Sequence, residues 1–143
     1  MPVRARDPRV PQDVEAYLVE LNARAGQLGG GRAGARGGAR GARRLMTRVE
    51  ERSGVVLSTA NDVRARLAAA EPNLIDLDTQ GGLVRFAVPL GLTGLNHIVV
   101  DLTFRDHTGT ATTVNLRAYG NEGLLNRQPT AKTADRLWAV ITS

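Results

Sequence analysis

The sequence predicts an α+β fold: an antiparallel sheet of about five strands with a C-terminal helix packed on one face, preceded by an amphipathic helix and a flexible Gly/Arg-rich tract. Alternating apolar and polar residues at 97–105 and 113–119 predict two neighbouring strands. Apolar residues at helical spacing near the C-terminus predict the closing helix. A stretch of glycine, arginine and alanine at 29–44 predicts the tract, because so many glycines cannot hold a helix.

Changes in composition divide the chain into three parts. A chain of 143 residues is long enough for one hydrophobic core, whereas two independent cores would each be marginal. We expect an N-terminal amphipathic helix within residues 1–28, a basic linker rich in glycine, arginine and alanine over 29–52, and the α+β domain over 53–143.

The first helix is predicted to start after Pro11 and to end near Gly26. Val14, Leu18 and Leu21 recur at i, i+4 and i+7 and form a narrow apolar stripe. A helix this short is marginal alone in water, so the stripe must be covered. Either the domain covers it, or residues 12–25 bind a protein partner or a second copy of the chain.

Within the domain, the expected order is strand, helix, four antiparallel strands and helix. "GVVLS", at 54–58, predicts the opening strand, and the next helix has Ser58 or Thr59 as its N-cap and Pro72 beyond its end. Thr130 is expected to cap the closing helix. Both domain helices are then expected to cover the apolar face of the sheet.

The turns predict the register of the first hairpin. A two-residue turn at 80–81 pairs Leu77 with Val84 and Asp76 with Arg85. Apolar side chains then meet on one face and opposite charges meet on the other.

The second hairpin is predicted to have a three-residue loop at 107–109. This loop pairs Leu102 with Val114 and places His97 opposite Tyr119. A slip of one residue would bury the polar side chains, so the face on which each residue lies follows from the alternation.

Two segments resemble parts of a known fold. "VVLSTANDVRARLA" looks like the opening strand and helix of the helix-grip fold, which defines the START and polyketide-cyclase-like (SRPBCC) superfamily, and "GLLNRQPTAKTADRLWAVI" looks like its last loop and closing helix. The likeness covers residues 54–141. It implies an apolar ligand between the sheet and the closing helix, lined by Phe86, Leu102, Phe104, Leu116, Leu137 and Trp138. The alternative is that these six side chains form the plain core.

One set of polar residues is expected on the opposite face of the sheet: His97, Asp101, Asn115, Arg117 and Tyr119. Arg117 is suited to bind an anionic group, since a planar guanidinium makes paired hydrogen bonds, but a solvated sheet face has the same pattern. No nucleophile, base and orienting group can be assembled from the sequence, which argues against an enzyme. Cysteine is absent and no spacing matches a metal-ligand pattern, so no metal or cofactor is expected.

The Gly/Arg-rich tract carries the excess positive charge. The net charge is +5, and residues 1–52 hold eleven arginines against six acidic residues. Five of them, Arg32, Arg36, Arg40, Arg43 and Arg44, would let residues 29–52 bind nucleic acid or another polyanion through its phosphates. The alternatives are a flexible tether and low-complexity drift in a GC-rich gene.

The sequence therefore favours a non-catalytic binding domain for a small apolar ligand, lipid-like or aromatic, or for a protein partner. Sequence-independent binding of nucleic acid through the tract is the alternative. No apolar run reaches the ~18 residues that a membrane span needs. Together with the absence of cysteine, this predicts a cytoplasmic protein.

Overall fold

The computed structural model describes residues 8–21, 46–80, 82–90, 96–108, 110–122 and 128–143. An N-terminal helix spans residues 12–21. The elements that follow are β1 (Met46–Val56), α2 (Ala60–Ala70), β2 (Ile75–Gln80), β3 (Leu83–Leu90), β4 (Asn96–Thr108), β5 (Ala111–Glu122) and α3 (Pro129–Ile141).

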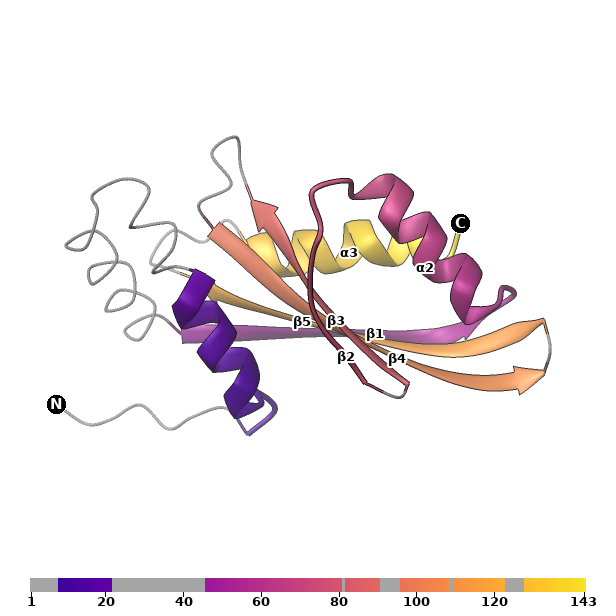
Figure 1. The fold of residues 1–143 in the computed structure, drawn as a ribbon, viewed down its shortest axis with the longest axis horizontal. Coiled ribbons are helices and arrows are strands. Elements are labelled where there is room, and N and C mark those ends of the chain that lie inside the picture. Colours follow the sequence, from indigo (N-terminus) through magenta and orange to yellow (C-terminus); the bar gives the residue numbers. More distant parts are fainter. Residues whose placement is uncertain (1–7, 22–45, 81, 91–95, 109, 123–127) are drawn as a thin grey trace, which may run out of the picture.

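The five strands form one antiparallel sheet in the order β1-β5-β4-β3-β2. The strands β2 to β5 follow one another as a meander, and β1 pairs with β5, so that β1 and β2 are the two edges. Figure 1 shows α2 and α3 on one side of this sheet and the N-terminal helix on the other. The predicted α+β fold, with its five-stranded sheet, C-terminal helix and N-terminal helix, is confirmed.

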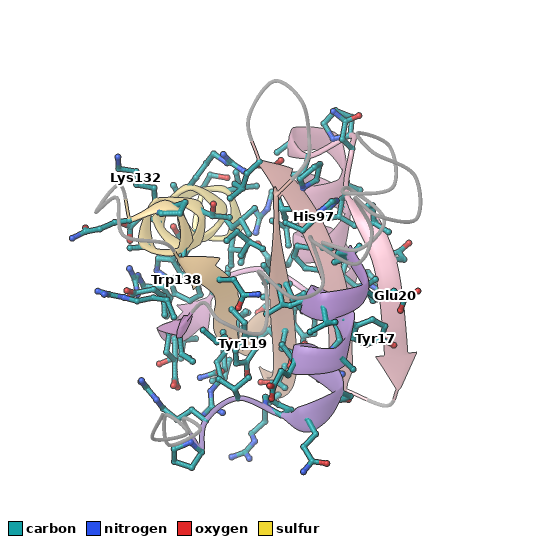
Figure 2. The ribbon with its side chains drawn as sticks, turned by 90° about the vertical axis from the view of Figure 1, so that its left-hand side faces the viewer. Tyr17, Glu20, His97, Tyr119, Lys132 and Trp138 are labelled. Carbon is teal, nitrogen blue, oxygen red and sulfur yellow. The ribbon has the colours of Figure 1, made fainter. Side chains whose placement is uncertain are left out.

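Buried side chains form two clusters, one on each face of the sheet. The inner face, which we define as the face toward α2 and α3, packs residues such as Phe86, Leu102, Leu116 and Leu137. The outer face packs Val99, Tyr119 and other side chains against the N-terminal helix. In Figure 2 the sheet lies between Trp138 of α3 and Tyr17 of the N-terminal helix. The sheet therefore has a core on both faces.

The apolar stripe of the N-terminal helix lies against its own sheet. Val14 and Leu18 are fully buried, and Leu21 is nearly so. They contact a cluster that includes Val99 and Tyr119 of the sheet. The sequence left open whether the domain or a partner covers this stripe, and the structure shows that the domain covers it.

The first strand is longer than the sequence indicated. It begins at Met46, whereas the apolar pattern placed its start at Gly54. Residues 46–52, which we expected in the basic linker, therefore form part of an edge strand. The alternation of charged residues there gave no apolar signal, because an edge strand buries less of its surface than a central one.

The register predicted for the first hairpin is wrong. Val84 pairs with Thr79, and Arg85 with Asp78, rather than with Leu77 and Asp76. Gln80, which was expected in the turn, pairs with Leu83 as part of β2, and this displaces both partners. A further shift in pairing between Asp76 and Asp78, as at a β-bulge, adds one residue to β2. A bulge changes the pairing without leaving a signal in the apolar alternation.

In the second hairpin the faces are as predicted, but the partners are displaced. Leu102 pairs with Leu116 rather than with Val114, and Val99 rather than His97 lies opposite Tyr119. Thr108 pairs with Ala111, which makes the turn shorter than the predicted three-residue loop, and the register shifts between Asp106 and Thr108.

One of the two predicted helix caps is present. The Thr59 hydroxyl accepts a hydrogen bond from the backbone N–H of Asp62 at 3.2 Å and caps α2. Thr130, in contrast, lies within the first turn of α3 and is buried, and Gln128 is the N-cap, with φ of 50°. Proline at the first helical position sets this start. A Cβ at Gly120 would collide with Thr130 and Ile98, so the glycine permits α3 to approach the sheet this closely.

Candidate functional site

A cleft opens on the inner face between α2 and the strands β2, β3 and β4. It encloses about 400 Å³. Val84, Phe86 and Leu102 form its apolar floor, and Ala65 and Ala68 of α2 line its wall. With Asp76 of β2, which also lines the cleft, the lining comes from four elements, so only the folded sheet and helix bring it together.

The cleft exists because α2 has small side chains where α3 has large ones. Ala65 and Ala68 stay exposed on α2, and only Val63 and Leu67 of this helix are buried. The other helix, α3, buries five residues, including Leu137 and Ile141. Alanine leaves space above the floor of the cleft that a larger side chain would fill.

The rim of the cleft carries three charged side chains. Glu71 accepts a hydrogen bond from Arg136 Nε at 2.9 Å, which ties the end of α2 to α3. Arg64 and Asp76 also line the cleft. Both are exposed, and neither forms an ion pair within the part of the chain that the structure describes.

The six residues that the sequence proposed as ligand lining do not lie together in the cleft. Phe86 and Leu102 line it. Leu116 and Leu137 are fully buried between the sheet and α3, and the other two, Phe104 and Trp138, are partly buried against the same cluster. The sequence pattern did not indicate α2 as the wall of the cleft. The signal that was available is the run of alanines on that helix.

On the outer face, Arg85 holds the N-terminal helix to the sheet. Its Nε donates to Asp101 Oδ1 at 2.6 Å and its Nη2 donates to Asp101 Oδ2 at 2.9 Å. Its Nη1 donates to Asp13 of the N-terminal helix. The guanidinium also lies 5.9 Å from the centroid of the Tyr17 ring. The hydrogen bonds to Asp101 and then to Asp13 raise the pKa of Arg85 above its usual range, against the effect of burial.

The other polar residues predicted on this face also lie there. Arg117 lies opposite Asp101 in the register of β4 and β5. Glu51 of β1 accepts from Asn115 Nδ2 at 2.8 Å and from Arg117 Nε at 3.2 Å. Tyr119 is buried, and burial is the main cause that raises its pKa. These groups stabilise the sheet and the N-terminal helix through contacts with one another.

The structure does not place His97 opposite Tyr119. Its Nδ1 is buried without a hydrogen-bond partner in the described residues, and burial lowers the pKa of the imidazole. The expected neighbour Tyr119 pairs with Val99 instead. Among the described residues, no three histidine, cysteine, aspartate or glutamate side chains come close enough to hold a metal ion.

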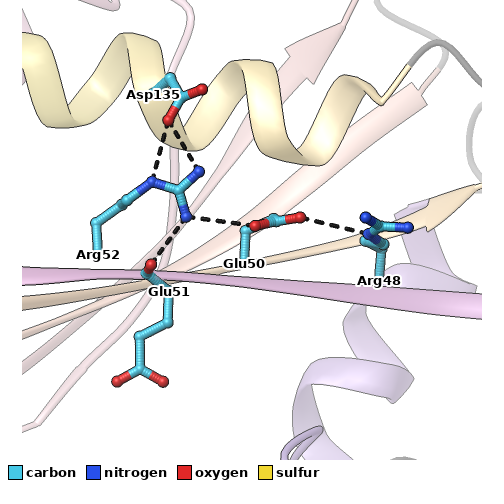
Figure 3. A network of polar contacts seen from close by, with 5 residues as sticks. All are labelled: Arg48, Glu50, Glu51, Arg52 and Asp135. Atoms are coloured by element: carbon cyan, nitrogen blue, oxygen red, sulfur yellow. Dashed lines mark hydrogen bonds and ion pairs between the residues drawn. The ribbon is translucent and has the colours of Figure 1, made fainter.

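The start of β1 carries a network of charged side chains that joins this edge strand to α3. Arg52 contacts Asp135 at 2.8 Å and Glu50 at 3.3 Å, and Glu50 also contacts Arg48 at 3.3 Å (Figure 3). Arg48 and Arg52 are therefore engaged in the fold and do not extend the basic tract. The tract arginines proposed for polyanion binding, Arg32, Arg36, Arg40, Arg43 and Arg44, lie outside the described residues.

No model of a known protein family matches the chain, and no curated protein matches it. Across the part of the chain that the structure describes, every helix is too short or too polar to cross a membrane.

Proposed function

We propose that the protein binds a small, largely apolar ligand, lipid-like or aromatic, in the cleft between α2 and the sheet. The cleft itself carries this proposal. Its volume of about 400 Å³ lies within the range of roughly 300 to 1,000 Å³ that is usual for small-molecule sites. An apolar floor with a few polar groups at the rim is also typical of such sites.

The lining residues support binding rather than catalysis. Arg64, Glu71 and Asp76 are the charged side chains around the cleft. Glu71 is held by Arg136, and beside the remaining carboxylate, Asp76, no hydroxyl, thiol or imidazole lies among the described lining residues to complete a catalytic set. The order strand, helix, four strands and helix supports the further proposal that the domain is of the helix-grip type. The ligand would then lie toward α2 rather than toward the closing helix.

The test places a large side chain in the cleft by a single substitution on α2 and leaves the rest of this helix unchanged. Ala68 lines the cleft, whereas the neighbouring Ala69 is exposed and does not line it. We expect the neutral fluorescent probe N-phenylnaphthylamine to bind the full chain with one site and to raise its melting temperature. Ala68→Phe should weaken that binding by about tenfold or more, because the ring occupies the cleft. Ala69→Phe is the matched control and should bind the probe normally.

Two results would contradict the proposal. The first is that the full chain binds neither this probe nor any member of a panel of lipid-like and aromatic compounds. The second is that Ala68→Phe and Ala69→Phe bind the probe equally well although both are folded.

Polyanion binding through the Gly/Arg-rich tract is the second candidate, and the uneven charge favours it. The structure engages Arg48 and Arg52 in ion pairs, which leaves the five arginines of 29–44 for this role. We expect the full chain to bind a random DNA duplex with an affinity that falls as salt rises. Replacing those five arginines by glutamine should abolish the salt dependence, whereas unchanged binding would exclude the tract as the site.

A further inference from the structure

The charged residues of the cleft rim lie at two separate ends. Arg64 and Glu71 are seven residues apart in sequence and lie on the same side of α2, about two turns or 10 Å from each other. Asp76 comes soon after Glu71, at the start of β2, and the backbone N–H of Leu74 between them donates to the carbonyl of Glu71 at 3.2 Å. Glu71 and Asp76 therefore share the end of the cleft beyond the C-terminus of α2, and Arg64 lies toward the other end.

Glu71 has an ion-pair partner within the described residues, whereas Arg64 has none. Arg136 holds Glu71 at 2.9 Å, and only 17% of the Glu71 side chain is exposed. Arg64 is exposed and forms no ion pair within the described part of the chain. Arg64 is thus the one cation on the described cleft lining, and its guanidinium is available to a ligand.

The opposite end of the cleft repels an anion. Asp76 is exposed and also forms no ion pair with the described residues. The carbonyls at the C-terminus of α2 add partial negative charge, and the last turn of this helix has no basic residue. An anionic group is therefore favoured near Arg64 and disfavoured near Asp76, and this asymmetry gives the ligand one orientation.

We propose that the ligand of this cleft is a small apolar carboxylic acid, with its carboxylate on Arg64 and its apolar body on Phe86 and Leu102. This inference rests on the proposed function and adds the class of ligand to it. A guanidinium takes a carboxylate through two parallel hydrogen bonds, which makes a carboxylate the matching head group. The apolar body lies over the floor of the cleft, where burial of its surface provides affinity.

The experiment compares three ligands that share one apolar chain: decanoate, decanamide and decylamine. The affinity of each ligand is measured by its displacement of N-phenylnaphthylamine from the full chain at neutral pH. We expect decanoate to bind about tenfold more tightly than decanamide, since a charge-assisted pair replaces a neutral contact. Arg64→Gln should remove that difference and leave decanamide unchanged. Asp76→Asn should strengthen decanoate a few-fold, because it removes the repulsion at the acidic end.

A matched control separates contact from a change in net charge. Lys132 is a cation on α3 that does not line the cleft, and Figure 2 shows it on that helix. Lys132→Gln should leave the affinity for decanoate as it is. A loss equal to that of Arg64→Gln would show that only the overall charge matters, and it would overturn the proposal.

Failure of this inference and failure of the proposed function give different results. Equal affinities for decanoate and decanamide, with no effect of Arg64→Gln, would overturn the carboxylate while the displaced probe still shows an apolar site. Tighter binding of decylamine, lost in Asp76→Asn, would replace the carboxylate by an amine. If the full chain binds neither the probe nor any of the three ligands, the proposed function and this inference both fail.

Discussion

At the scale of single residues, the surroundings of Arg85 decide how much each of its two ion pairs contributes to stability. It is 3% exposed, and its two acidic partners differ in burial. The side chain of Asp101 is 10% exposed, whereas that of Asp13 is 60% exposed. The same guanidinium therefore makes one ion pair inside the protein and one at the surface.

This difference predicts unequal losses of stability from the same substitution. Asp101→Asn should lower the free energy of unfolding by about 3 kcal/mol or more, because it leaves Arg85 buried beside a neutral group. Asp13→Asn should cost less than about 1 kcal/mol, since water screens an exposed pair. Urea unfolding of both variants measures the two values. Equal losses would show that burial does not set the strength of these pairs.

The partners of Arg85 were only partly predictable. The alternation in 97–105 placed Asp101 on the polar face, as the structure shows. The turn argument, however, paired Arg85 with Asp76 instead of Asp78, and nothing in the sequence linked it to Asp13. Asp13 lies 72 residues from Arg85 in the chain, and only the packing of the N-terminal helix brings them together.

At the scale of elements, the N-terminal helix completes the outer face of the sheet. Without it, Val99, Tyr119 and the pair of Arg85 with Asp101 would face water. The helix packs through Leu18 and its neighbours, and Asp13 adds the contact to Arg85. The stripe was predicted from its spacing, but its partner surface was not, because the polar residues on that face indicated a solvated sheet.

We expect Leu18→Asp to separate this helix from the sheet. A fully buried leucine contributes about 2 kcal/mol, and a carboxylate cannot replace it in an apolar contact. Amide hydrogen exchange should become faster in residues 12–21, while the strands β3 to β5 keep their protection. Ala16→Asp, on the exposed side of the same helix, is the control and should leave exchange unchanged. Unaltered exchange in Leu18→Asp would show that the helix does not depend on this contact.

The two helices of the inner face show why the cleft was not foreseen. Both have helical periodicity, and both were predicted. Their difference lies in side-chain volume, since Ala68 of α2 leaves space and Leu137 of α3 fills it. Small side chains on a helix leave a cleft only where another part of the fold lies opposite them. Here that part is formed by β2, β3 and β4, which the predicted pattern of no single element places opposite α2.

At the scale of the whole molecule, the sheet lies between two helical layers. Titratable groups lie both in the interior and at the surface. Among the described residues, three acidic or imidazole groups have lowered pKa values in the folded protein. The hydrogen bond from Arg85 lowers the pKa of Asp13, and that from Asn115 lowers the pKa of Glu51. Burial lowers the pKa of His97. In each case the unfolded chain binds protons more readily than the folded one.

Stability should therefore fall as the solution is acidified. The contribution of His97 is complete above its ordinary pKa of 6.5 and is lost as the pH falls below that value. Those of Asp13 and Glu51 are lost below their ordinary pKa values of 3.8 and 4.5. Urea midpoints from about pH 8 to about pH 3 measure this dependence. His97→Gln should flatten the upper part of the curve, and a curve unchanged by that substitution would contradict the role of His97.

The sequence by itself determined the type and order of the elements, the faces of the central strands, the apolar stripe of the first helix and a cap for α2 at Ser58 or Thr59. Each of these depends on residues close together in the chain, where the periods of helix and strand apply directly. The tertiary structure decided the register, through the positions of the turns and through strand irregularities that leave no trace in the alternation. It also decided the cleft and the triad of Asp13, Arg85 and Asp101, because these are contacts between elements that are distant in sequence.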